Sequence, residues 1–156
     1  MSLNNLPEVI IYTDGSCHPS NPGPGGYAAI LLDNQGNEIN RICGGCIHST
    51  NNRMELMSAI KGIELLNEPH NILVYTDSEY LANGVMKWLD GWIRNNWIRG
   101  KNKPVINQDL WEELHKLRSI HQIEVKWVKG HAQNQWNILC DKLAFNAASN
   151  AQSIAA

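Results

Sequence analysis

Two continuous runs of apolar residues end in the same dipeptide. Residues 9–16 read V-I-I-Y-T-D-G-S, and residues 72–78 read I-L-V-Y-T-D-S. Such runs are typical of strands that are buried on both faces. Because each predicted strand stops at a Thr-Asp pair, we expect Asp14 and Asp77 to lie side by side at one edge of a sheet.

The rest of the chain divides into alternating and helical patterns. The Gly- and Pro-rich residues 15–26 predict a loop, and strands are expected over Tyr27–Asp33, Glu38–Ile47 and Gln122–Val128. Helical spacing predicts helices over about 49–67, 78–89 and 136–149, and one that starts at residues 107–109. The last helix is expected to bury Leu139, Leu143 and Ala147. This order predicts an α/β layer fold, in which ligands gather beyond the strand ends.

The length of 156 residues suits one domain, with a core over about 8–149 and a short flexible tail over 150–156. No apolar run approaches the roughly 20 residues of a bilayer span, and the first residues lack a secretory signal pattern. We therefore expect a cytoplasmic monomer. Cys43 and Cys46 form a C-G-G-C, but no second pair completes a zinc site, and a strand points them to opposite faces. Free thiols are expected.

The net charge of −2 argues against a generally basic nucleic-acid-binding protein. A local patch differs, because residues 91–108 contain no acid and several cations. Tryptophans are interleaved with these cations, a mixture that can hold a phosphate backbone. The patch comprises Trp88, Trp92, Arg94, Trp97, Arg99, Lys101 and Lys103.

Four carboxylates have ordinary explanations when each is considered alone. Glu55 follows Asn52 by three residues in an expected first helical turn, which resembles a capping box. Asp77 can be an N-cap, and Asp141 a solvated helical residue. The predicted fold nevertheless allows both to converge with Asp14 and Glu55. Such a cluster repels itself unless cations neutralise it, and hard oxygen ligands select Mg²⁺ or Mn²⁺ over zinc.

Five motifs in order connect these residues to a known family. Y-T-D-G-S with N-P-G-P-G-G-Y is followed by T-N-N-R-M-E-L-M, T-D-S-E-Y, V-K-G-H-A and C-D-K-L-A, over about residues 9–148. This series resembles type 1 ribonuclease H, the bacterial ribonuclease HI family. The resemblance implies a five-stranded mixed sheet, three antiparallel strands and then two parallel ones, flanked by about four to five helices. It also implies metal-dependent endonucleolytic cleavage of the RNA strand of RNA–DNA hybrids, leaving 5′-phosphate and 3′-hydroxyl ends.

Carried over by position, the resemblance makes Asp14, Glu55, Asp77 and Asp141 ligands of two Mg²⁺ ions, for which Mn²⁺ can substitute. It makes His131 the mobile residue of the active-site loop, suited to shuttle a proton or to help product leave. The cationic patch corresponds to a protrusion that grips the DNA strand. Contacts to the hybrid, which can include its 2′-hydroxyls, are implied for Asn21, Thr50, Asn51, Asn52, Glu79 and Asn137.

The chain departs from the family pattern at three places. One residue is inserted between Cys17 and Asn21, which can displace the Asn21 contact. Glu79 stands where family members often have Gln, and the residues after His131 read A-Q-N-Q-W-N-I-L, without Gly or Pro. Two alternatives stay open: a non-catalytic or weakly active hybrid-binding module, and an integrase-like nuclease of the same fold. The presence of all four carboxylates opposes the first, and the short chain with its T-N-N-R-M-E-L match opposes the second.

Overall fold

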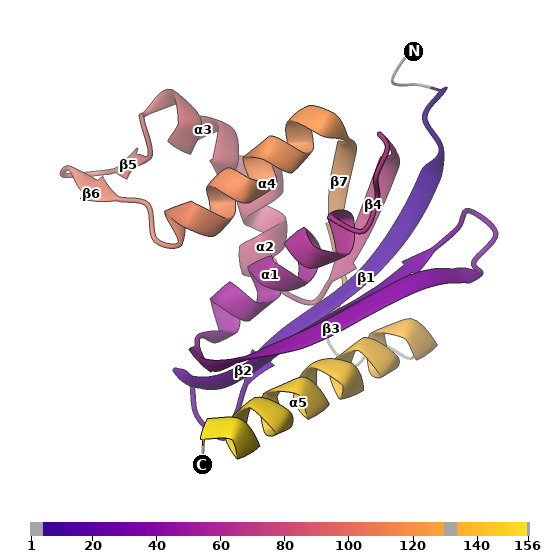
Figure 1. Ribbon diagram of the computed structural model, residues 1–156. Helices are drawn as coiled ribbons and strands as arrows, with labels where there is room; N and C mark the ends of the chain where they lie inside the picture. Colours follow the sequence, from indigo (N-terminus) through magenta and orange to yellow (C-terminus); the bar gives the residue numbers. More distant parts are fainter. Residues whose placement is uncertain (1–4, 130–133, 156) are drawn as a thin grey trace.

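A five-stranded mixed sheet forms the centre of the structure, a computed structural model that describes residues 5–129 and 134–155 (Figure 1). Its strand order is β3-β2-β1-β4-β7. The pairs β1–β2 and β2–β3 are antiparallel, whereas β1–β4 and β4–β7 are parallel. The predicted α/β fold with three antiparallel and two parallel strands is thus confirmed. The strands are β1 (Glu8–Cys17), β2 (Gly23–Leu32), β3 (Glu38–Ser49), β4 (Asn71–Thr76) and β7 (Gln122–Trp127).

Helices cover the two faces of this sheet unequally. Figure 1 shows α1 (Asn51–Ile63) and α4 (Gln108–Ile120) on one face and α5 (Gln135–Ala155) along the other. The alternation of β1 and β2 serves both layers: Ile11 and Leu31 belong to the core under α1, whereas Tyr12 and Ile30 belong to the smaller core under α5. Both strands are therefore buried on both faces, as the continuous apolar run predicted for β1.

The hairpin between β1 and β2 is longer than expected. Pairing continues past Asp14 to Cys17↔Gly25, so the expected loop over residues 15–26 shortens to His18–Pro22. The glycines of this segment allow close packing, because a Cβ at Gly26 would collide with the backbone of α5 at Ala144. The sequence pattern indicated a loop where the glycines instead permit a strand beneath a helix.

The buried face of α5 also differs from the prediction. Small residues, Cys140, Ala144, Ala148 and Ala151, form the buried stripe, whereas Leu139, Leu143 and Ala147 are half-buried beside it. The cause is the same close approach, since α5 lies against the Gly-rich part of β2 and β3. The helix also passes the expected end at Ser149, so residues 150–155 belong to it.

The segment after β4 is helical for longer than expected. It consists of α2 (Glu79–Asn83), a π-helical stretch η2 (Gly84–Trp88) and α3 (Leu89–Arg94). A two-stranded hairpin follows, β5 (Ile98–Arg99) and β6 (Lys103–Pro104), which projects away from the sheet (Figure 1). We call the segment from Trp88 to Pro104 the protrusion.

All four cysteines are free thiols, as expected for Cys43 and Cys46. In the part of the chain that the structure describes, none of the helices combines the length and hydropathy that a bilayer crossing needs.

Candidate active site

Asp14 and Asp77 occupy equivalent places on two parallel strands. The pairing of β1 with β4 ends at Tyr12↔Tyr75, and the aspartate follows two residues later in each of the two segments. The indole Nε1 of Trp127, at the end of β7, donates a hydrogen bond of 3.0 Å to the Asp77 carbonyl oxygen. The three parallel strands therefore hold this end of the sheet together, and the predicted juxtaposition of the two aspartates is present.

Glu55 does not cap α1, so the capping-box interpretation of this residue taken alone does not hold. The N-cap is Thr50, whose Oγ1 accepts from the Arg53 N–H at 3.1 Å, and Glu55 lies beyond the first turn. Its carboxylate is directed inward instead, with 8% of the residue exposed. A Cβ at Gly15 would collide with the backbone at Met54, so β1 and α1 lie close enough to bring Glu55 beside Asp14.

Three carboxylates meet beyond the strand ends. One oxygen each of Asp14, Glu55 and Asp77 lies within 4.8 Å of the others, with the first two residues buried and Asp77 exposed. Burial, followed by the charge of Asp77 and a hydrogen bond with Asp141, raises the pKa of Asp14 to about 8. Burial and then the charges of Asp14 and Asp77 raise the pKa of Glu55 as well. The side chains are thus held together against their own repulsion.

The chemistry of this cluster fits a divalent cation. Among the described side chains, the Oε2 atom of Glu55 is buried and has no hydrogen-bond partner. A buried acceptor without a partner is costly, especially beside other carboxylates. A hard cation that binds oxygen ligands would satisfy this atom and neutralise the repulsion. We therefore describe Asp14, Glu55 and Asp77 as a candidate metal site.

A hollow of about 240 Å³ opens in front of the cluster and includes residues from α5. Asp141 lines it and interacts with Asp14, and Asn137 lines it one turn earlier. Lys129 and Ile138 also line the hollow and were not expected there; only the V-K-G-H motif marked the position of Lys129. His131 lies outside the described residues.

The start of α1 carries the residues expected to contact a hybrid. Asn51 and Asn52 are exposed in the first turn, directly after the cap Thr50. The insertion after Cys17 does not separate Asn21 from the start of α1, because Asn21 Oδ1 accepts a hydrogen bond from the Asn51 N–H at 3.0 Å. Asn51 Oδ1 in turn accepts from the Cys17 N–H at 2.7 Å. These residues therefore form one polar surface between the β1–β2 loop and α1.

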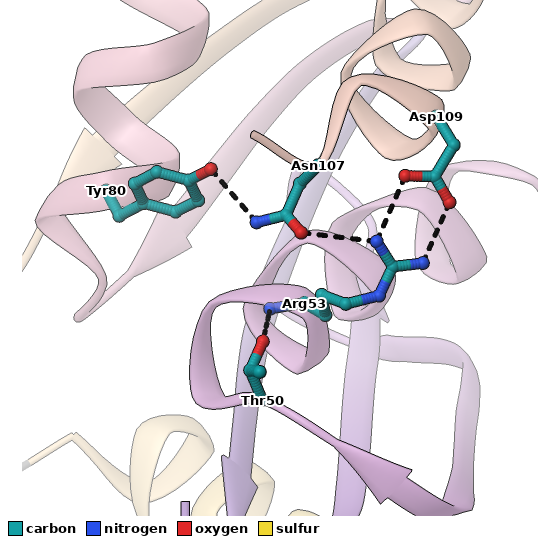
Figure 2. Close-up of polar contacts among 5 residues, drawn as sticks. All are labelled: Thr50, Arg53, Tyr80, Asn107 and Asp109. Atoms are coloured by element: carbon teal, nitrogen blue, oxygen red, sulfur yellow. Dashed lines mark hydrogen bonds and ion pairs between the residues drawn. The ribbon is translucent and has the colours of Figure 1, made fainter. Parts of the chain in front are cut away.

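A polar network links this surface to the start of α4 and to Tyr80 of α2 (Figure 2). The Arg53 guanidinium donates to both carboxylate oxygens of Asp109, at 3.0 and 2.8 Å, and to Asn107 Oδ1 at 3.2 Å. Asn107 Nδ2 in turn donates a hydrogen bond of 3.1 Å to the Tyr80 hydroxyl. The Arg53 contact lowers the pKa of Asp109. Arg53 is thus a structural connection that the sequence pattern did not indicate.

The protrusion combines aromatic packing at its base with cations at its tip. Trp88 is 40% exposed and lies 5.8 Å, between ring centroids, from Trp92. Trp92 and Trp97 are half-buried against the core, so they offer less surface to a ligand than Trp88 does. The exposed cations are Arg94 at the end of α3, Arg99 on β5, Lys101 at the turn and Lys103 on β6. Glu79 is exposed at the start of α2, two residues after Asp77.

Comparisons with known proteins agree on one family. A family model described as RNase H matches residues 7–149. The ribonuclease H of Rickettsia bellii is 46% identical over 151 residues, which are 96% of this chain and 95% of that protein. The ribonuclease H of Phenylobacterium zucineum is 46% identical over 145 residues, 93% of each chain.

A solved structure extends the agreement to three dimensions. LC9-RNase H1, described as a type 1 RNase H with the type 2 active-site motif, superimposes with a TM-score of 0.81 and 28% identity. The match covers 93% of this chain and 74% of that one. Since the family model spans every strand of the sheet and relatives of matching length share nearly half of their residues, the chain belongs to the ribonuclease H family.

Proposed function

We propose that this chain is an endonuclease that hydrolyses the RNA strand of RNA–DNA hybrids and leaves 5′-phosphate and 3′-hydroxyl ends. The observation that carries the proposal is the carboxylate cluster, with its unsatisfied buried oxygen on Glu55, in a chain of the ribonuclease H family. The function requires divalent cations, for which we propose two Mg²⁺ ions, with Mn²⁺ as a substitute.

Asp14, Glu55, Asp77 and Asp141 are proposed to hold these cations. Asp14 interacts with each of the other three carboxylates, so it would act together with all of them in holding the cations. Bound divalent cations supply Lewis acidity, which activates a water molecule and stabilises the charge that develops on the leaving 3′-oxygen. Carboxylates must be ionised to bind a cation, so cation binding would release the protons that the raised pKa values of Asp14 and Glu55 retain.

The hybrid is proposed to lie across the surface from the hollow to the protrusion. Asn21, Thr50, Asn51 and Asn52 would meet the minor groove, where 2′-hydroxyls distinguish RNA from DNA. The exposed face of Trp88 and the cations of the protrusion would hold the DNA backbone. Asn137 and Glu79 lie at the margin of the carboxylate cluster, and His131 is proposed to assist proton transfer or product release.

We also propose that the chain is a single ribonuclease H domain, that it acts as a monomer and that it works in the cytoplasm. Free cysteines, half-buried or exposed except for Cys140, agree with a reducing compartment.

Cleavage of end-labelled substrates tests the function. RNA–DNA hybrid, duplex DNA and duplex RNA are incubated with Mg²⁺ or with EDTA. We expect metal-dependent cleavage of the hybrid alone, in its RNA strand. Asp14→Asn should abolish cleavage because an amide is a poor cation ligand, while Asp33→Asn, the same change in the β2–β3 turn, should leave it intact. Hybrid binding without cleavage would indicate a binding module, and cleavage of duplex DNA an integrase-like nuclease.

A further inference from the structure

The loop from His18 to Pro22 is held on its inner side by the start of α1. Two hydrogen bonds run in opposite directions: the Asn51 N–H donates to Asn21 Oδ1 at 3.0 Å, and the Cys17 N–H donates to Asn51 Oδ1 at 2.7 Å. Because a backbone N–H only donates, both side-chain amides are oriented with their oxygen toward the protein. Their Nδ2 groups are left as donors.

The same loop is held on its outer side by α5, through His18. The His18 imidazole stacks on the Phe145 ring, with centroids 3.9 Å apart and planes 8° from parallel. Its Nε2 atom lies 3.0 Å from the Phe145 carbonyl oxygen and 3.2 Å from Ser149 Oγ. A carbonyl oxygen only accepts, so Nε2 carries the proton and donates to Phe145. One side chain therefore makes a ring contact and polar contacts to the last element of the fold.

The spacing in the loop connects the two anchors. His18 and Asn21 are three residues apart, and Pro19 and Pro22 restrict the backbone between and after them. The His18 N–H also donates to the Pro24 carbonyl oxygen at 3.0 Å, which fixes the loop to the start of β2. The connection from His18 to Asn21 is therefore short and partly restricted.

We propose that His18 is a positioning residue for substrate recognition: by docking the β1–β2 loop on α5, it orients the Nδ2 donors of Asn21 and Asn51. This inference rests on the proposed function, in which these donors face the hybrid. Their partners would be acceptors of the minor groove, the 2′-oxygens and the base O2 and N3 atoms. The loop contains the inserted residue, so the His18 contacts explain how a longer loop still presents Asn21.

Three variants separate this role from general stability. His18→Ala removes both contacts, His18→Phe keeps only the ring, and His115→Ala changes an exposed histidine of α4 as a control. Hybrid cleavage gives KM and kcat, and binding is measured in the Asp14→Asn background, where cleavage is expected to stop. We expect His18→Ala to raise KM and weaken binding about threefold to tenfold, the range for one or two lost neutral contacts. Its kcat should stay within about twofold, since no contact to the carboxylates is lost.

Amide hydrogen exchange supplies a readout that does not depend on cleavage. The Asn51 and Cys17 N–H groups should exchange faster in His18→Ala, partly recover in His18→Phe and remain unchanged in His115→Ala. The proposal would be overturned if His18→Ala changed neither KM nor exchange at these amides. It would also be overturned if His18→Ala lowered kcat threefold to tenfold and left KM constant. If wild-type protein neither binds nor cleaves hybrids, the proposed function fails, while amide exchange still decides whether His18 holds the loop.

Discussion

Replacing Asp14 with Asn should stabilise the metal-free protein while it removes activity. The pKa of Asp14 is about 8 in the folded chain, whereas an unfolded aspartate has a pKa of about 4. The unfolded state therefore releases this proton first, and folding loses stability as pH rises between these values. At about pH 7 the cost has a ceiling of about 4 kcal/mol, because each pKa unit corresponds to about 1.4 kcal/mol.

The expected gain is smaller than this ceiling. The cost belongs to a cluster that still contains Glu55 and Asp77, and the new amide is itself buried and polar. We expect Asp14→Asn to add about 1–2 kcal/mol, which raises the melting temperature by about 2–8 °C for a chain of this size. The gain should be larger at about pH 8 than at about pH 5.5, because the cost of ionising Asp14 grows across that window.

Thermal unfolding in EDTA, followed by circular dichroism at both pH values, measures this gain. Asp109→Asn is the matched control with the opposite sign, since Arg53 lowers the pKa of Asp109 and stabilises its charge. Added Mg²⁺ should raise the melting temperature of the wild type more than that of Asp14→Asn. A lower melting temperature for Asp14→Asn in EDTA at both pH values would refute the reasoning, because it would mean that burial and the neighbouring carboxylates do not make the ionised Asp14 costly.

Three further changes test other parts of the structure. Arg53→Lys loses the paired contact to Asp109 and should cost about 0.5–1 kcal/mol in urea unfolding at neutral pH, since the pair is partly exposed; the difference should vanish in acid, where the partner carboxylate is protonated. Gly84→Ala places a Cβ against the Trp111 ring and should cost about 1–3 kcal/mol, whereas Gly91→Ala, with its nearest neighbour 3.9 Å away, should cost far less. Simultaneous replacement of three cations of the protrusion by Gln should raise KM for the hybrid and leave kcat unchanged; the cations are Arg99, Lys101 and Lys103. The slope of log KM against log salt concentration should fall by up to about 3.

The parts of the site that follow from strand ends could be predicted from the sequence. The same apolar run precedes Asp14 and Asp77, and parallel pairing in register places both at one end of the sheet. Period and register are local properties, so the pattern reports them directly.

The parts that depend on close approach between distant elements could not be predicted from period and register. Considered alone, Glu55 resembled a capping residue, and only the T-N-N-R-M-E-L-M motif marked it as a ligand; the packing of β1 on α1 places its carboxylate inward. The buried face of α5 is set by its close packing against glycines of β2 and β3. The spacing of apolar residues within α5 carries no information about those glycines. His18 gave no signal, because its partners Phe145 and Ser149 lie more than a hundred residues away along the chain.

The parallel pairing of β1 with β4 has a consequence for synthesis of the protein. The aspartates that this pairing brings together lie 63 residues apart along the chain, and Asp141, on α5, lies a further 64 residues on. Contacts of such large sequence separation form late and slowly in folding. A partly synthesised chain therefore contains fewer carboxylates than the complete cluster, and its nuclease activity should appear only after translation has passed α5.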